Sequence, residues 1–383
     1  MEDRMKQQEA AETEKSFPDV KQSDTKQPDM EHYAADMPGW AEQPEQSGKH
    51  KNRIPVYVLS GVLVVMLIAA AVIGLRNGQA SASDDMTMPQ TAEGPQEKWQ
   101  EGTVSYNGKK YKYNNNIKSY LFMGIDKNEP VEEAKDAISG GQSDGMFLVV
   151  TNAKDKSISV ISIHRNTMTK IEACDTAGLN KQEIMGQICL QHGYGDGKHY
   201  SCSKAVDAVS YLFYNLPISG YIALNMGGIP MLNDSVGGVE VTVLQDLLYP
   251  DWGAELYAGE TKTLTGNEAY TYLRGRDVDE FDSATGRLRR QEQYIMSFMQ
   301  KARTVIAGDA EKATEIYNSL SDYLVTDVDF VSFVSDLVSY EPDENGMYTV
   351  SGETVMGEEF EEFYVDDDAL YDLIIQIFYE EVE

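Results

Sequence analysis

The fold is decided by residues 144–165, which read DGMFLVVTNAKDKSISVISIHR. Two apolar runs, Met146–Thr151 and Ser157–Ile163, flank Asn-Ala-Lys-Asp at positions 152–155. The second run alternates polar and apolar residues, which is typical of a β-strand with one face on a core. We therefore predict two antiparallel strands joined by a short turn.

This hairpin brings distant residues to one edge of a sheet. Asp144 begins the first strand and Arg165 follows the second, and in an antiparallel pair these ends lie side by side. A further apolar run, Ser119–Ile125, is followed by Asp126. If that strand ends at the same edge, two carboxylates and an arginine converge there.

Helical and strand patterns alternate irregularly through the rest of the chain. Strands are predicted over Tyr221–Asn225 and Val239–Val243. Helices are predicted over Ser203–Leu216, from the capping box Thr265–Glu268 through Leu273, and along an apolar face from Leu288 to Ile306. The C-terminal stretch, which ends with Ala369–Tyr379, adds helical and strand-like segments. This order predicts a mixed α/β fold, a central mixed β-sheet covered by helices.

Composition excludes some partners. The chain has 383 residues, 42% of them hydrophobic, so one or two domains with a sizeable core are expected. Its formal net charge of −31 disfavours nucleic acid or a bare anionic membrane as the main partner, because both reward basic surfaces.

Arginine is concentrated against this acidic background. Five of the chain's ten arginines fall between positions 274 and 290: Arg274, Arg276, Arg287, Arg289 and Arg290. Guanidinium groups bind phosphate oxygens with paired hydrogen bonds, so the cluster indicates a local phosphate site.

The geometry of the cluster can be anticipated from spacing. Arg287, Arg290 and Gln291 share one face of a helix, and Arg274 and Arg276 point the same way if their segment is extended. The alternative is a set of structural salt bridges with neighbouring acids, and spacing leaves it open. These acids are Asp277, Asp279, Glu280 and Asp282.

A membrane anchor is predicted near the N-terminus. Residues 54–75 form an uncharged apolar run long enough to span a bilayer as a helix. Cations precede it at Lys49, Lys51 and Arg53, which places the N-terminus in the cytoplasm and the rest outside a cell membrane crossed once. A signal peptide cleaved at Ala80-Ser81-Ala82 is the alternative, although the run is long and far from the start.

The predicted span divides the chain. Residues 1–53 are polar and poor in β-branched side chains, so we predict a disordered cytoplasmic tail. Residues 76–103 are predicted to be a linker and residues 104–383 an extracytoplasmic domain. The cysteines of that domain, Cys174, Cys189 and Cys202, form no Cys-x-x-Cys pair; one disulfide or three free thiols remain open.

Four blocks of residues resemble the LytR–CpsA–Psr family over about residues 117–380. They are Leu121-Phe122-Met123-Gly124-Ile125-Asp126; Gly141-Gln142-Ser143-Asp144, similar to Gly-Arg-Ser-Asp; Ser162-Ile163-His164-Arg165-Asn166, similar to Ser-Ile-Pro-Arg-Asp; and Tyr272-Leu273-Arg274-Gly275-Arg276 with Arg287-x-x-Arg290-Gln291. Their order, with Val236-Gly237-Gly238-Val239 between them and an N-terminal anchor, makes the resemblance specific.

The resemblance implies a function. Such proteins hold a polyprenyl pyrophosphate in a deep apolar pocket and transfer teichoic acid, capsular polysaccharide or a similar glycopolymer from it to peptidoglycan, with possible hydrolysis of the pyrophosphate as a side reaction. Carried over, Asp126 and Asp144 would hold Mg²⁺ and be catalytic together with Arg165. The pyrophosphate would be bound by Arg165, Arg274, Arg276, Arg287, Arg290 and Gln291. Arg289 has no counterpart.

Three residues depart from the family pattern. Gln142 stands where arginine is usual, Asn166 where aspartate is usual and His164 where proline is usual. Asn166 cannot act as a base or an anionic metal ligand. These changes keep a second interpretation open, a non-catalytic polyprenyl-pyrophosphate-binding scaffold; a membrane-tethered regulator of envelope genes is the third.

Overall fold

The structure is a computed structural model that describes residues 102–308, 310–328 and 339–382. The predicted tail, membrane span and nearly all of the linker lie outside these residues. Within the described ranges, no helix combines the length and the apolar character needed to cross a bilayer.

A six-stranded sheet forms the centre of the molecule, in the order β13-β8-β3-β4-β5-β14. Its strands are β3 (Ile117–Ile125), β4 (Ser143–Asn152), β5 (Ser157–Ile163), β8 (Gly220–Asn225), β13 (Leu324–Thr326) and β14 (Glu341–Thr349). The β3-β4-β5 meander is antiparallel, whereas β8 runs parallel to β3 and β14 parallel to β5. The predicted hairpin is confirmed, and the sheet is mixed.

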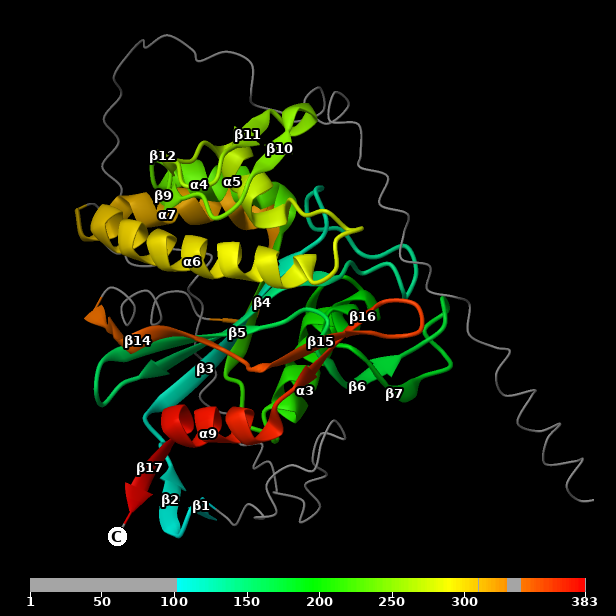
Figure 1. The fold of residues 1–383 in the computed structure, drawn as a ribbon, viewed down its shortest axis with the longest axis vertical. Coiled ribbons are helices and arrows are strands. Elements are labelled where there is room, and N and C mark those ends of the chain that lie inside the picture. The colour runs from blue at the N-terminus through cyan, green and yellow to red at the C-terminus, as the bar shows by residue number, and fades with distance from the viewer. Residues whose placement is uncertain (1–101, 309, 329–338, 383) are drawn as a thin grey trace, which may run out of the picture.

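Helices cover both faces of this sheet (Figure 1). One face carries α3 (His199–Leu212) and α9 (Asp367–Phe378), and the other carries α4 (Ile229–Ser235), α5 (Gly266–Arg274), α6 (Ser283–Gly308) and α7 (Ala310–Leu320). Successive residues of β3 enter the two cores in turn: Tyr120 and Phe122 pack under α4–α7, Leu121 and Met123 under α3 and α9. The predicted mixed α/β fold is confirmed.

Smaller sheets surround this centre. They are β1 (Thr103–Tyr106) and β2 (Lys109–Tyr113) with β17 (Tyr379–Val382); β6 (Met168–Ala173) with β7 (Gln182–Gln187); β9 (Glu240–Thr242) with β12 (Thr261–Thr263); β10 (Leu247–Tyr249) with β11 (Ala254–Leu256); and β15 (Gly352–Met356) with β16 (Glu361–Val365). Short 3-10 helices connect several elements: η2 (Ile188–Gly193), η3 (Met226–Gly228), η4 (Pro250–Trp252) and η5 (Ser321–Tyr323).

Two element ends differ from expectation. Helix α3 stops at Leu212 rather than Leu216 because Tyr214 and Asn215 adopt positive φ angles of 57° and 61°, which no α-helix continues. The strand predicted over Val239–Val243 is the short β9, which pairs with β12 outside the central sheet. The capping box at the start of α5 is confirmed.

Candidate functional site

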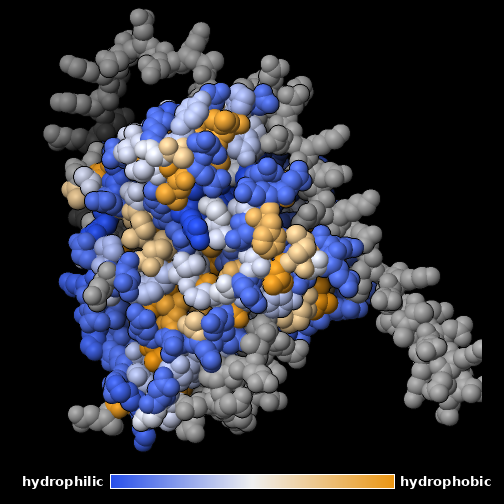
Figure 2. Space-filling view, in the orientation of Figure 1, coloured by the Kyte–Doolittle hydropathy of each residue, from blue (hydrophilic) through white to orange (hydrophobic). Residues whose placement is uncertain are grey.

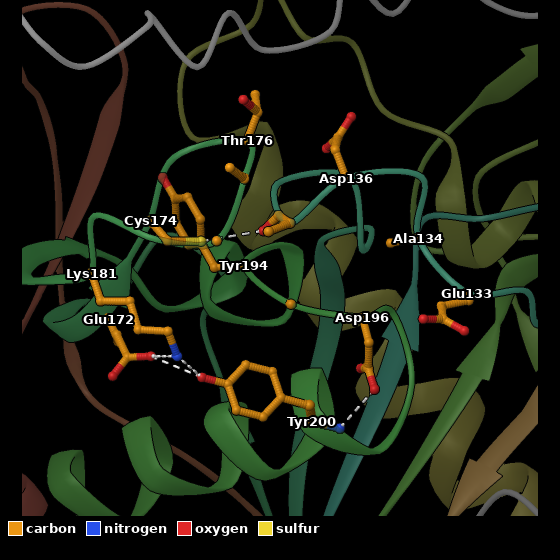
Figure 3. A pocket seen from close by; sticks show the side chains of 14 residues that line it. Glu133, Ala134, Asp136, Glu172, Cys174, Thr176, Lys181, Tyr194, Asp196 and Tyr200 are labelled. Carbon is orange, nitrogen blue, oxygen red and sulfur yellow. Dashed lines mark hydrogen bonds and ion pairs between the residues drawn. The ribbon is translucent and has the colours of Figure 1, made fainter.

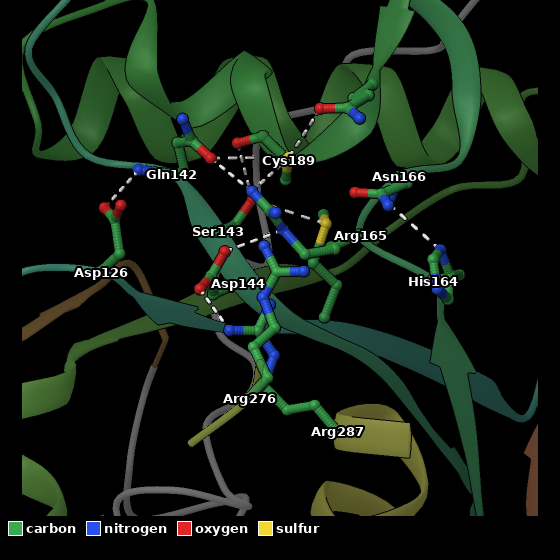
Figure 4. A network of polar contacts seen from close by, with 12 residues as sticks. Asp126, Gln142, Ser143, Asp144, His164, Arg165, Asn166, Cys189, Arg276 and Arg287 are labelled. Atoms are coloured by element: carbon green, nitrogen blue, oxygen red, sulfur yellow. Dashed lines mark hydrogen bonds and ion pairs between the residues drawn. The ribbon is translucent and has the colours of Figure 1, made fainter. Parts of the chain in front are cut away.

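Asp144 and Arg165 lie in contact at the edge of the hairpin. The register pairs Met146 with Ile163, so Asp144 and Arg165 stand just beyond the paired residues. Arg165 Nε lies 2.8 Å from Asp144 Oδ1. Asp126 follows the end of β3 beside them (Figure 4), and its Oδ1 accepts a 2.6 Å hydrogen bond from the Gln142 backbone N–H.

The arginine-rich segment reaches the same place. Arg287, in the first turns of α6, donates from Nη1 to Asp144 Oδ2 at 2.7 Å. Arg276, in the connection between α5 and α6, points into the same group (Figure 4) and lies within 3.3 Å of Ser283 Oγ. We call Asp126, Asp144, Arg165, Arg276 and Arg287 the arginine site.

The two carboxylates of this site differ in acidity. Burial and the charge of Asp144 raise the pKa of Asp126 to about 6. Burial also disfavours ionised Asp144, but Arg165 and Arg287 outweigh it and hold the pKa of Asp144 well below its usual value. Asp144 is therefore a fixed anion, while Asp126, with a pKa of about 6, gains or loses its proton in mildly acidic solution.

Positive charge is not fully neutralised in the arginine site. Burial and the nearby Arg287 and Arg165 lower the pKa of Arg276 to about 10. Burial likewise lowers the pKa of Arg287, whose Nη2 is buried without a hydrogen-bond partner. A bound anion would reduce the repulsion between these guanidiniums and accept a hydrogen bond from Arg287 Nη2.

The other predicted residues lie nearby with different partners. Arg274 stacks over the rings of Trp252 and Tyr270 and donates to the Tyr270 hydroxyl. Arg290 is fully buried and donates to the Gly275 carbonyl, and Gln291 donates to the Leu273 carbonyl at 3.1 Å. Arg290 and Gln291 thus hold the segment that carries Arg276.

The structural salt bridges considered from sequence are not formed. Across the described parts of the chain, no ion pair joins the clustered arginines to Asp277, Asp279, Glu280 or Asp282. Asp282 instead accepts hydrogen bonds from the hydroxyls of Thr285 and Thr354. Arg289 is exposed.

His164 and Asn166 are buried beside the site. Burial lowers the pKa of His164 to about 4, so the ring is neutral at pH 7. Its Nδ1 accepts the Asn166 backbone N–H, and its ring stacks on Phe363 at 4.5 Å. Asn166 Nδ2 lies 3.5 Å from Glu361 Oε2. His164 supports packing rather than proton transfer.

Sequence reasoning did not anticipate two contacts of Arg165, one with Gln142 and one with Cys189. Gln142 Oε1 and Cys189 Sγ both accept from Arg165 Nη2, the second at 3.2 Å. Cys189 comes from η2, and no motif links it to Arg165. It is a free thiol, as are Cys174 and Cys202, so the alternative without a disulfide holds.

The two carboxylates fit a magnesium ion in donor type. Each carboxylate has about four lone pairs that can accept a hydrogen bond or bind a metal. Asp126 uses one of them for the Gln142 N–H, and Asp144 uses two for Arg165 and Arg287, so both carboxylates keep lone pairs for an ion. Among the described residues, no three His, Cys, Asp or Glu side chains are grouped to hold a metal. Water and phosphate oxygens would complete the shell, which is usual for Mg²⁺.

A second concavity is lined in part by the loop between β3 and β4 (Figure 3). This hollow, of about 370 Å³, is lined by the carboxylates of Glu133, Asp136, Glu172 and Asp196 and by a single lysine, Lys181. We call it the acidic hollow. Its carboxylates oppose phosphate binding, in contrast to the guanidiniums of the arginine site.

Comparison with known proteins agrees with the fold and the motifs. A 30% identical relative is the polyisoprenyl-teichoic acid–peptidoglycan teichoic acid transferase TagU of Enterococcus faecalis, over 55% of this chain and 62% of that protein. The protein of the same name from Oceanobacillus iheyensis is 26% identical over 82% of this chain and 91% of its own length. The chain thus spans about three fifths of the first relative.

Solved structures share the fold. The protein gbs0355 of Streptococcus agalactiae matches with a TM-score of 0.56 at 21% identity, covering 68% of this chain and 86% of that one. A structure of TagT bound to LI-WTA matches with a TM-score of 0.52 at 20% identity, covering 69% and 90%. A family model, the LytR_cpsA_psr family, matches residues 78–372. The chain belongs to the LytR–CpsA–Psr family.

Proposed function

We propose that this protein transfers a glycopolymer from a polyprenyl-pyrophosphate carrier to peptidoglycan, at the outer side of a membrane to which residues 54–75 anchor it. The observation that carries the proposal is the under-neutralised group of three guanidiniums around one fixed carboxylate. A pyrophosphate diester supplies the missing negative charge. The relatives' names, which state teichoic acid transfer to peptidoglycan, give the glycopolymer and the acceptor.

The lipid tail belongs on the apolar side of this site. Arg287 lies in the first turns of α6, and the same helix carries buried Leu288, Phe298 and Met299 in the core between the sheet and α4–α7. We place the apolar pocket in that layer. Leu248 on β10 is an exposed apolar side chain, and separate apolar groups interrupt a mostly hydrophilic face in Figure 2.

The proposed reaction is a phosphoryl transfer. An acceptor hydroxyl oxygen attacks the phosphorus next to the glycan, the bond from that phosphorus to the bridging oxygen breaks, and polyprenyl phosphate leaves. Arg165, Arg276 and Arg287 stabilise the charge that grows on the phosphate oxygens. Asp126, with its pKa near 6, can accept the hydroxyl proton at neutral pH. Water in place of the acceptor would give pyrophosphate hydrolysis.

Asp126 and Asp144 would hold Mg²⁺ if the protein uses it. The ion would neutralise charge on the pyrophosphate and raise the electrophilicity of its phosphorus. The arginines act on the same oxygens without it, so removal of Mg²⁺ should slow transfer without abolishing binding of the donor.

A non-catalytic scaffold is the second candidate, favoured by Asn166 and Gln142. Asn166 offers no carboxylate, which leaves Asp126 as the single candidate base of the site. The deciding experiment mixes the full-length chain with a polyprenyl-pyrophosphate-linked saccharide and peptidoglycan fragments, and follows the covalent product by mass spectrometry. Product formation supports transfer; tight donor binding with no product supports the scaffold.

A further inference from the structure

Arg165 is held on one side of its guanidinium by two neutral acceptors. Its Nη2 donates to Gln142 Oε1 and to Cys189 Sγ, while its Nε faces Asp144 Oδ1 at 2.8 Å. Among the described residues, Nε is buried without a hydrogen-bond partner, so Asp144 holds it as an ion pair. The two hydrogen bonds of Nη2 and this ion pair together fix the plane of the guanidinium.

Both acceptors are themselves anchored. The Gln142 backbone exchanges two hydrogen bonds with Asp126, N–H to Oδ1 at 2.6 Å and carbonyl to backbone N–H at 3.0 Å. The preceding residue, Gly141, has a φ of 87°, and its carbonyl lies 2.9 Å from the Nδ1 of buried His192. On the other side, the Cys189 backbone N–H donates to the Arg165 carbonyl, and its own carbonyl accepts from Ser143.

We propose that Gln142 and Cys189 form a clamp that orients Arg165, so that Gln142 acts as a positioning residue for the donor phosphate rather than as a weakened phosphate ligand. This inference rests on the proposed function. An arginine at position 142, as in the family's Gly-Arg-Ser-Asp element, would bring a second guanidinium against Arg165 and remove its acceptor.

The experiment measures the affinity of the full-length chain for a short polyprenyl pyrophosphate, farnesyl pyrophosphate, by calorimetry. Gln142→Leu should weaken binding on the order of tenfold, because Arg165 loses its fixed orientation. Gln142→Arg should weaken it as well, despite the added charge. Cys189→Ser keeps an acceptor beside Arg165 and should stay within about threefold of the wild type.

A double-mutant cycle separates positioning from mere folding. In an Arg165→Lys background the clamp has no guanidinium to orient, so Gln142→Leu should then change the affinity less than about twofold. A matched control is Gln191→Leu, at a buried glutamine on the same 3-10 helix as Cys189, whose side-chain amide exchanges hydrogen bonds with the Glu172 backbone. It should lower the thermal midpoint without changing farnesyl pyrophosphate binding.

Three results would overturn the clamp. The first is that Gln142→Leu lowers the affinity for farnesyl pyrophosphate equally in the wild type and in the Arg165→Lys background. The others are tighter binding by Gln142→Arg and unchanged binding by Gln142→Leu. A wild-type protein that binds no farnesyl pyrophosphate would instead overturn the proposed function.

Discussion

The arginine site and the acidic hollow both adjoin the loop of residues 127–142, but they differ in how their charges are satisfied. In the arginine site, buried guanidiniums outnumber the one firmly ionised carboxylate, and Arg287 Nη2 has no partner. In the acidic hollow, Asp196 accepts three backbone N–H groups, and Glu172 accepts from Lys181 and Tyr200.

This difference in how far the charges are satisfied shows which of the two regions gains more free energy when it binds a ligand of opposite charge. Satisfied charges at a solvated surface contribute little to recognition, because water and existing partners already stabilise them. Buried charges of one sign with unmet donors gain much more when a ligand of opposite charge arrives. The predictions below test whether the two regions differ in this way, beginning with the largest effect.

Arg287→Ala should reduce glycopolymer transfer on the order of 100-fold, because it removes one guanidinium of the proposed phosphate site. Asp144 keeps Arg165 as its partner, so the fold should survive. The matched control is Arg289→Ala, two residues along the same helix and exposed. Transfer rates of the two variants are compared; equal rates would remove the arginine site from the reaction.

The sequence predicts the core of this site because its geometry is local. The β4–β5 hairpin is encoded by alternation and a turn, and antiparallel pairing then brings Asp144 to Arg165. The mixed sheet follows from the same patterns. Arg287 could be included because it belongs to the arginine cluster and its spacing places it on one helix face with Arg290 and Gln291.

The parts that sequence did not predict depend on where a segment ends or docks. Arg274 and Arg276 were expected to point the same way, but Arg274 is the last residue of α5 and lies over Trp252, which comes from η4. The contact of Cys189 with Arg165 requires η2 to pack under the β3–β4 loop. Neither packing arrangement leaves a periodic signal in the chain.

Asp126→Asn should stabilise the protein at high pH. A raised pKa means that the folded state binds the proton more tightly than the unfolded one, so the contribution of Asp126 is present below pH 3.8 and is lost as pH rises through about 6. At pH 8 without divalent cations, the variant should exceed the wild type by on the order of 2–3 kcal/mol. Denaturant unfolding at pH 3.5 and pH 8 measures this, and a constant difference would refute it.

Asp196→Ala in the acidic hollow should lower the free energy of unfolding, in contrast to Asp126→Asn, which should raise it. Asp196 accepts the backbone N–H groups of Lys198, Tyr200 and Ser201 at the start of α3, and these bonds lower its pKa despite partial burial. The variant should lose about 1 kcal/mol of unfolding free energy at pH 7, as for a lost helix cap. The loss should shrink as pH falls through the folded-state pKa, and farnesyl pyrophosphate binding should not change.

Glu172→Gln should give the smallest effect, less than about 1 kcal/mol of unfolding free energy. Glu172 lies 3.0 Å from Lys181 and 3.5 Å from Lys204, and all three side chains keep between 25% and 44% of their surface exposed. Water therefore screens these pairs, and added salt should reduce the difference further. Unfolding measured at low and high salt checks this. A large loss that salt does not change would mean that charge in the acidic hollow is as tightly held as in the arginine site, and the contrast between the two regions would fail.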